Sequence, residues 1–186
     1  MAAEDAATPL ERMIIVIVSL IVAIGAIAAL SGVFAANDQP GVTGAASGPG
    51  LAFPDLGHAH LPPGSPRPAY NSHPPTSGAH VSESIQANGQ RVNADQLLSA
   101  LEVGDVVFMY GGPAPPPGLA AVARSVAAPF SPSLAAAGQA VILARRPGTH
   151  GLIAVAWTRM LHVGAVDDPL LRQFAQFWLG RGAPGR

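Results

Sequence analysis

Residues 93–112 read NADQLLSALEVGDVVFMYGG, and this stretch decides the fold of the chain. Asn93 can cap a short helix, and Gly104 can end it. The helix carries three leucines on one face: Leu97, Leu98 and Leu101. The apolar run Val106–Tyr110 follows directly and is bounded by two glycines, which is typical of a buried strand. The sequence therefore predicts a helix that leads straight into a buried strand.

The residues that follow predict a second helix and two more strands. Residues 117–128 form a weak Ala-rich helix between prolines, and residues 140–144 form a strand. Residues 145–151 turn, and residues 152–161 return as a longer strand. We therefore expect a hairpin between these two strands.

A last helix follows near the C-terminus. Asp167 or Asp168 caps it, and Pro169 lies in its first turn. Its apolar face consists of Leu170, Leu171, Phe174, Phe177 and Trp178. The order helix, strand, helix, strand, strand, helix predicts a small α+β domain, a mixed β-sheet packed with helices, over residues 58–183.

Upstream of this domain lies an apolar segment that predicts a transmembrane helix. Residues 13–36 read MIIVIVSLIVAIGAIAALSGVFAA and contain no charged side chain. As a helix they reach ~36 Å, against a hydrocarbon core of ~30 Å. A cleaved signal peptide is the alternative, because Val33–Ala35 before Ala36 fits a cleavage site. The segment is longer than the ~7–15 residues typical of a signal peptide, which favours a retained single-pass anchor in the lipid bilayer.

The basic residues indicate the orientation of the anchor. Arg12 precedes the segment, and the next basic residue is Arg67. Positive charge favours the inner side, so residues 1–12 are expected to be a cytoplasmic tail. Residues 37–57, rich in Gly, Ala, Ser and Pro, then form a flexible linker. The domain that follows is expected to be extracytoplasmic, at the cell membrane.

The overall composition excludes several classes of function. The formal net charge is -1, which gives no electrostatic basis for binding nucleic acid. The chain contains no Cys, which excludes disulfides and thiolate catalysis. The sequence names no protein partner.

Four of the six histidines fall in one Pro-rich segment, residues 57–80, which reads GHAHLPPGSPRPAYNSHPPTSGAH. They are His58, His60, His73 and His80. Imidazole is the commonest protein metal ligand, so the segment is a candidate copper or zinc site. No standard spacing such as HExxH is present, and solvated loop histidines with one buried member are the simpler interpretation.

Other candidate residues carry weaker signals. Ser77 lacks the GxSxG context of a hydrolase nucleophile. Glu102 and Asp105 flank Gly104 and could act as an acid/base pair, although carboxylates at a helix end are usually solvated. Met109 could be a soft copper ligand, but a methionine in a strand more often fills the core.

The segment Tyr70, Pro74-Pro75-Thr76-Ser77-Gly78 and His80 resembles the signature of a bacterial family, domain of unknown function 3105. The resemblance covers roughly residues 58–183. It assigns family motif positions to His60, to Leu101, Glu102 and Gly104, to the strand at Val106, Val107 and Tyr110, and to Ala156-Trp157. Ser99 and Val103 stand where the family pattern has histidines, and Ala79 replaces a proline. The resemblance implies a fold and a membrane association but no reaction.

Three functions follow as hypotheses. The first is a single-pass, membrane-anchored extracytoplasmic module with a binding or scaffolding role. The second is a copper- or zinc-binding module that uses His60 and His80, with help from His58, His73 or Met109. An enzyme is the third, because no catalytic motif is present.

Overall fold

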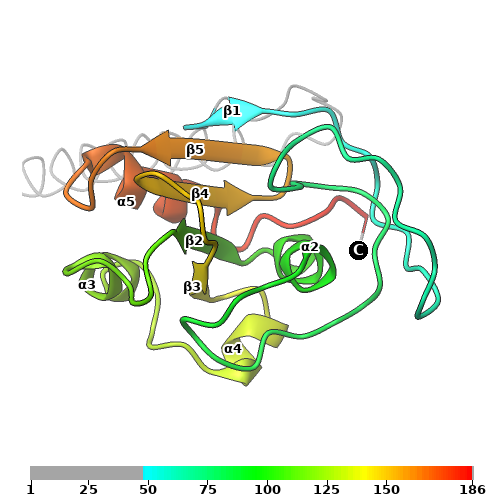
Figure 1. Cartoon of the computed structure of the whole chain (residues 1–186), viewed down its shortest axis with the longest axis horizontal. Helices are drawn as coiled ribbons and strands as arrows, with labels where there is room; N and C mark the ends of the chain where they lie inside the picture. Colours follow the sequence, from blue (N-terminus) through cyan, green and yellow to red (C-terminus); the bar gives the residue numbers. More distant parts are fainter. Residues whose placement is uncertain (1–47, 186) are drawn as a thin grey trace, which may run out of the picture. The chain divides into compact units, whose positions relative to one another are not determined.

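The computed structural model describes residues 48–185, which form a five-stranded mixed sheet with helices packed against it (Figure 1). The strand order is β1-β5-β4-β2-β3, and β2 and β3 are parallel while the other neighbours are antiparallel. The elements are β1 (Leu51–Ala52), α2 (Ala94–Val103), β2 (Val106–Tyr110), α3 (Leu119–Arg124), α4 (Pro132–Ala136), β3 (Val141–Arg145), β4 (Leu152–Ala156), β5 (Arg159–Val163) and α5 (Pro169–Trp178). The predicted α+β class is confirmed.

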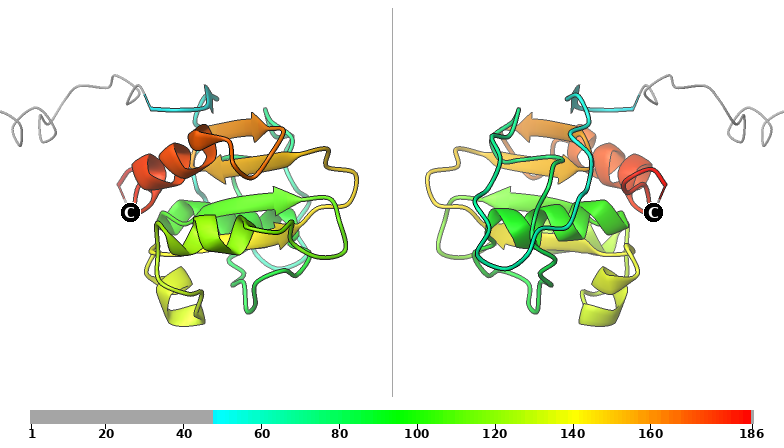
Figure 2. Two further views of the ribbon diagram at one scale, coloured as in Figure 1. Left: turned by 90° about the vertical axis from the view of Figure 1, so that its left-hand side faces the viewer. Right: turned by 90° about the vertical axis from the view of Figure 1, so that its right-hand side faces the viewer.

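The sheet separates two apolar cores. Alternate residues of a strand point to opposite faces, so Val107 and Met109 of β2 join one core, while Val106, Phe108 and Tyr110 join the other. Helices α2 and α4 pack on the first face, and α3 and α5 pack on the second. Figure 2 shows this layering, with long loop segments lying over the α2 side of the sheet.

Helix α2 begins and ends where its sequence predicts. The Asn93 side chain accepts a hydrogen bond from the backbone N–H of Gln96, and the Gln96 side chain accepts one from the backbone N–H of Asn93. Gly104 ends the helix with a φ of 112°, a conformation that a side chain disfavours. Because Leu98 and Leu101 are fully buried, the helix is fixed against the sheet.

The hairpin predicted between residues 140–144 and 152–161 is wrong. Strand β2 lies between β3 and β4 and pairs with both. The hairpin joins β4 and β5 instead, and it turns at Trp157 and Thr158, where Thr158 has a φ of 58°. No Gly or Pro marks this turn, so the apolar run from 152 to 161 resembles one long strand.

Two helices also differ from the prediction. The weak helix expected over 117–128 is shorter, Leu119–Arg124, and the short helix at Pro132–Ala136 is not expected from the sequence. Ser131 caps that helix by accepting a hydrogen bond from the Leu134 N–H. A five-residue helix is too short to produce a clear 3.6-residue period, which explains why the sequence pattern does not reveal it.

The structured domain begins earlier than the composition indicates. Residues 48–57, which the composition assigns to the linker, lie against the domain: Leu51 and Ala52 pair with β5. The Trp178 indole Nε1–H donates to the Pro49 carbonyl oxygen at 2.8 Å. Glycine at residue 48 suits a close approach to aromatic side chains, because a Cβ there would lie 2.3 Å from the Phe177 ring.

The predicted tail at 1–12, the predicted transmembrane helix at 13–36 and the linker up to residue 47 lie outside the described residues. Within residues 48–185, no helix has the length and apolar character needed to cross a bilayer.

Candidate metal centre

One polar face of helix α2 holds the loop that carries the histidines. Asp95, Ser99 and Glu102 are spaced four and three residues apart, so they lie on the same side of the helix. An Asp95 oxygen accepts the Val81 N–H at 3.0 Å, and Asp95 also pairs with Arg67. Ser99 Oγ accepts the Glu83 N–H at 3.0 Å. These bonds fix the chain just after His80 and leave Glu102 to face the loop.

Two segments of that loop run side by side as extended backbone. The His80 N–H donates to the Ala59 carbonyl at 3.1 Å, and the Leu61 N–H donates to the His80 carbonyl at 2.8 Å. In an extended chain, residues two apart point the same way. This geometry explains why His58 and His60 both face Glu102.

Three imidazoles consequently surround one buried carboxylate. His60 Nε2 lies 2.9 Å from Glu102 Oε2, and His80 Nε2 lies 3.1 Å from the same oxygen. His58 Nδ1 is 3.7 Å from Glu102 Oε1. The Glu102 side chain is 7% exposed and that of His60 is 54% exposed, so the cluster is buried on one side and open on the other. The donor atoms of His60, His80 and Glu102 all lie within 4.8 Å of one another, as a shared metal ion requires.

The fully buried His80 has its tautomer set by the backbone. Its Nδ1 is 3.0 Å from the Gly78 carbonyl oxygen, which only accepts hydrogen bonds, so Nδ1 carries the proton. The Nε2 lone pair of the neutral ring then faces the Glu102 oxygen, and this nitrogen has no hydrogen-bond partner among the described residues. Two acceptors 3.1 Å apart repel each other unless a proton or a metal ion lies between them.

Within the Tyr70–His80 motif, only His80 contacts the Glu102 carboxylate. The other residues of the motif shape the site around it. Tyr70 Oη donates to the Ala79 carbonyl at 3.1 Å. Ser77 Oγ accepts the Leu56 N–H, and the Thr76 carbonyl accepts the Thr158 N–H. Gly78 has a φ of 124°, and a Cβ there would lie 3.0 Å from the Tyr70 ring.

Pro74 and Pro75 are also buried in this turn. The motif therefore positions His80. The Ser77 hydroxyl is occupied by a hydrogen bond from the backbone.

The remaining candidate ligands lie elsewhere. His73 contacts Arg146, whose Nη2 donates to His73 Nε2 at 2.7 Å, so His73 is not brought to the cluster. Met109 is 1% exposed in the apolar core on β2. His58 is at the edge of the cluster and packs edge-on against Trp157, with ring centroids 6.3 Å apart.

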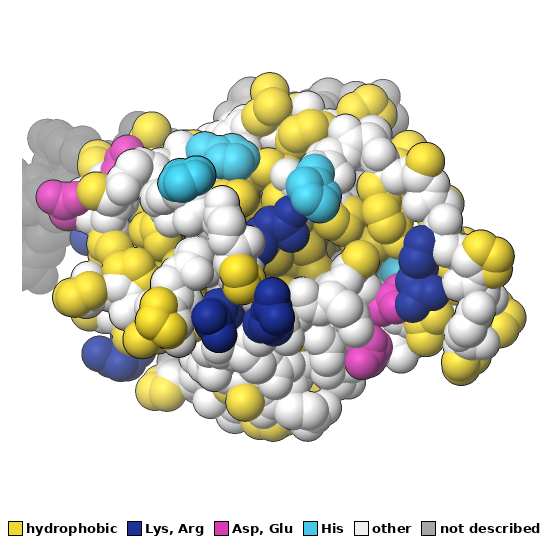
Figure 3. All heavy atoms as spheres, viewed as in Figure 1, with side chains coloured by type: hydrophobic (Ala, Val, Ile, Leu, Met, Phe, Trp, Pro, Cys, Tyr) yellow, Lys and Arg dark blue, Asp and Glu magenta, His cyan; other side chains and the backbone are white. Residues whose placement is uncertain are grey.

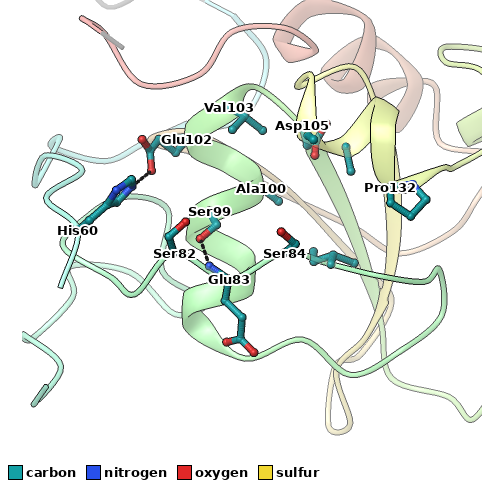
Figure 4. A pocket seen from close by; sticks show the side chains of 13 residues that line it. His60, Ser82, Glu83, Ser84, Ser99, Ala100, Glu102, Val103, Asp105 and Pro132 are labelled. Atoms are coloured by element: carbon teal, nitrogen blue, oxygen red, sulfur yellow. Dashed lines mark hydrogen bonds and ion pairs between the residues drawn. The ribbon is translucent and has the colours of Figure 1, made fainter. Parts of the chain in front are cut away.

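A cavity of about 240 Å³ opens beside His60 and Glu102, between α2 and α4 (Figure 4). Asp105 also lines this cavity. One Asp105 oxygen accepts the Ala140 N–H at 2.8 Å, and the other has no partner among the described residues. Burial raises the pKa of Asp105 to about 7, and the Ala140 hydrogen bond opposes this shift.

The sequence offers His60 and His80 among four candidate histidine ligands, but it does not offer Glu102 as a ligand. From the sequence, Glu102 is only a family motif position and half of a possible acid/base pair with Asp105. No local pattern links residue 102 to residues 60 and 80, because the contact arises only when the loop folds over α2.

Residues 65–185 match the model of the family described as Protein of unknown function (DUF3105). The match includes His80 and Glu102 and begins after His60. No curated protein and no solved structure shows significant similarity to the chain. Because the match spans more than half of the sequence, this chain belongs to the DUF3105 family of proteins of unknown function.

Proposed function

We propose that this protein binds a divalent transition-metal ion, zinc or copper, through His60, His80 and Glu102. The observation that carries the proposal is the orientation of His80. Its Nδ1–H donates to the Gly78 carbonyl, and its Nε2 points at a buried carboxylate oxygen 3.1 Å away. A backbone carbonyl that fixes the distal nitrogen is the usual arrangement behind a histidine that ligates a metal.

The spacing of the donors supports the same conclusion. Tetrahedral zinc with bonds of ~2.0–2.1 Å holds its donor atoms about 3.3 Å apart. The imidazole nitrogens of His60 and His80 lie 2.9 and 3.1 Å from Glu102 Oε2, so small side-chain shifts make room for the ion. Two imidazoles and a carboxylate suit Zn²⁺ and Cu²⁺ alike.

A three-residue ligand set leaves a coordination position open, as in sites that bind an exchangeable ligand. His60 is half exposed and lines the 240 Å³ cavity, so the open position faces solvent or the cavity. This supports a binding module whose metal holds a further ligand, and His58 provides a third imidazole at the edge of the site.

The test is metal titration of the full-length chain in detergent. We expect one Zn²⁺ or Cu²⁺ per chain at micromolar affinity or tighter, measured by calorimetry and by elemental analysis after dialysis. His60→Ala removes a half-exposed ligand with little effect on folding, so affinity falls by about 100-fold or more while thermal unfolding of the metal-free protein is unchanged. Glu102→Gln keeps the shape and weakens binding similarly.

His73→Ala is the matched control, because this histidine lies in the same loop but contacts Arg146. It leaves the affinity unchanged. Absence of stoichiometric binding in the parent chain would show that the cluster is only a hydrogen-bonded network. An equal loss of metal affinity in His73→Ala and His60→Ala would refute this choice of ligands.

We further infer that the domain is held at the outer surface of the cell membrane by residues 13–36 as a single-pass anchor. The support is the uncharged apolar run and the basic Arg12 before it. A periplasmic-type reporter enzyme fused after Arg186 is expected to be active, and a cytoplasmic reporter inactive. The reverse result would overturn the orientation.

A further inference from the structure

A second cluster of basic side chains lies apart from the metal centre, around the turn between β3 and β4. A groove of about 450 Å³ is lined by His73, Arg146, Pro147, Gly148, Thr149, His150, Ile153 and His162. None of these described lining residues is acidic. Figure 3 shows histidine and arginine side chains gathered in the middle of one face, with the acidic side chains in view lying toward its sides.

Three distant segments of the chain build this groove. His73 comes from the loop before the Pro74-Pro75 turn, Arg146 and His150 from the β3–β4 connection, and His162 from β5. His162 lies directly opposite Ile153 of β4 in the antiparallel register, so both side chains are on the same face of the sheet. The tertiary fold alone brings these basic groups together.

The turn that carries Arg146 has the geometry of a type II turn. Thr149 N–H donates to the Arg146 carbonyl at 3.1 Å, which closes a four-residue turn. Pro147 fixes the second position, and Gly148 has the positive φ of 87° that a type II turn needs at the third. An ordered turn lowers the entropic cost of holding a ligand.

The Arg146 guanidinium is held in place by a hydrogen bond, but its positive charge is not paired with a carboxylate. Its Nη2 donates to His73 Nε2 at 2.7 Å, and within residues 48–185 it forms no ion pair with a carboxylate. A guanidinium has five N–H donors in a planar fork that matches the oxygens of a phosphate. The buried Thr149 Oγ1 in the groove wall also lacks a hydrogen-bond partner among the described residues.

From this geometry we propose that the groove is a binding site for a phosphate group. Arg146 supplies the charge-assisted donors, and His73 positions its guanidinium. His150 provides a further N–H donor at the rim, and His162 provides one through Nδ1, because its Nε2 already contacts Met160 Sδ at 3.1 Å. The same chemistry recognises free phosphate and the phosphomonoester headgroup of a lipid.

The experiment uses the full-length chain in detergent, freed of metal with a chelator so that the metal centre cannot hold the anion. Inorganic phosphate and the soluble short-chain lipid dihexanoyl phosphatidic acid are titrated separately by calorimetry, with dihexanoyl phosphatidylcholine as the lipid control. Binding of both phosphate probes identifies a general phosphate site. Binding of phosphatidic acid alone identifies a headgroup site, and either result supports the proposal.

Arg146→Gln is expected to weaken the binding by about tenfold or more, since a hydrogen bond to a charged group is lost. Arg172→Gln is the matched control: it removes the same charge from the exposed face of α5, across the sheet. It leaves the affinity unchanged. His73→Ala weakens phosphate binding several-fold and leaves metal affinity intact, which separates this site from the metal centre.

Two results would overturn the proposal. One is the absence of binding of both phosphate probes at millimolar concentration. The other is an equal loss in Arg146→Gln and Arg172→Gln, which would show diffuse charge attraction and no site. Failure of metal binding at His60 leaves this test unaffected.

Discussion

At the scale of single residues, two of the three described buried polar atoms that lack a hydrogen-bond partner lie at the Glu102 cluster and in the cavity beside it. His80 Nε2 and Asp105 Oδ2 both have no hydrogen-bond partner among the described residues. The first faces the Glu102 carboxylate, and this contact is the observation behind the proposed metal site. The second belongs to a carboxyl group whose pKa is raised to about 7 by burial.

Asp105 makes the stability of the domain depend on pH. Its pKa of about 7 in the folded chain exceeds the ordinary value of 3.8, so the folded state holds the proton between these values. The free energy of unfolding therefore falls as pH rises from about 4 to about 7, by at most about 1.36 kcal/mol per pH unit from this group. Asp105→Asn keeps an oxygen that accepts the Ala140 N–H, and its side chain cannot ionise. Its free energy of unfolding is therefore expected to rise relative to that of the parent protein as pH rises.

Chemical denaturation of both proteins at several pH values between about 5 and about 8 measures this difference. All other side chains are the same in both proteins, so the difference between the two curves reports on residue 105. If the two stability curves run parallel over this range, the raised pKa of Asp105 is refuted.

At the scale of elements, helix α2 organises the site through its polar face while its leucines fill the core. Asp95 holds the backbone after His80, and Glu102 lies two turns further along the same face. The helix thus fixes both the carboxylate and the loop that brings the imidazoles to it.

Asp95 is expected to act on metal affinity through the position of His80. Asp95→Ala removes the acceptor of the Val81 N–H and the partner of Arg67, and we expect metal affinity to fall by about tenfold. Asp95→Asn retains an acceptor for Val81 and causes a smaller loss. Calorimetric titration with Zn²⁺ compares them, and an effect of Asp95→Asn as large as that of Asp95→Ala would contradict a role through the Val81 bond.

The end of α2 depends on the absence of a side chain at residue 104. Gly104 has a φ of 112°, and a Cβ there would lie 2.9 Å from the Gly180 carbonyl carbon. Gly104→Ala therefore adds a backbone clash to the roughly 1–2 kcal/mol that the left-handed conformation costs. Gly64→Ala is the control, because Gly64 also has a positive φ, 83°, and a Cβ there would meet no atom within 4 Å.

Urea denaturation of the two variants is expected to show the larger loss of unfolding free energy for Gly104→Ala. Equal losses would indicate that the chain around Gly180 moves aside without cost.

At the scale of the whole molecule, the domain includes residues that the composition assigns to a linker. Strand β1 covers part of the β5 edge, and Pro49 accepts the Trp178 indole N–H. Residues 48–57 therefore belong to the structured domain rather than to a flexible tether.

A chain that begins at residue 58 is expected to be less stable than one that begins at residue 48. The shorter chain leaves the Trp178 N–H without its acceptor and exposes the edge of β5, at a cost of about 1–3 kcal/mol. Thermal unfolding measures the difference as a lower Tm. An unchanged Tm would mean that residues 48–57 do not stabilise the fold.

The sequence by itself determined the features that depend on neighbouring residues. The cap at Asn93, the end of α2 at Gly104, strand β2 and the start of α5 at one of the two aspartates Asp167 and Asp168 follow from local chemistry. The family motif from Tyr70 to His80 is recognisable for the same reason, since its residues lie close together in the chain. The histidine-rich loop can therefore be recognised as a candidate metal-binding segment from the sequence, although its partner Glu102 cannot.

Only the tertiary structure decided the strand order and the composition of both sites. Strand β2 separates β3 from β4 because pairing depends on which buried faces meet, and adjacent segments of sequence do not encode that choice. Likewise, Glu102 joins His60 across 42 residues, and Arg146 joins His73 across 73 residues. Contacts over such separations exist only after the apolar faces of α2 and the sheet have packed, because that packing sets where each loop can lie.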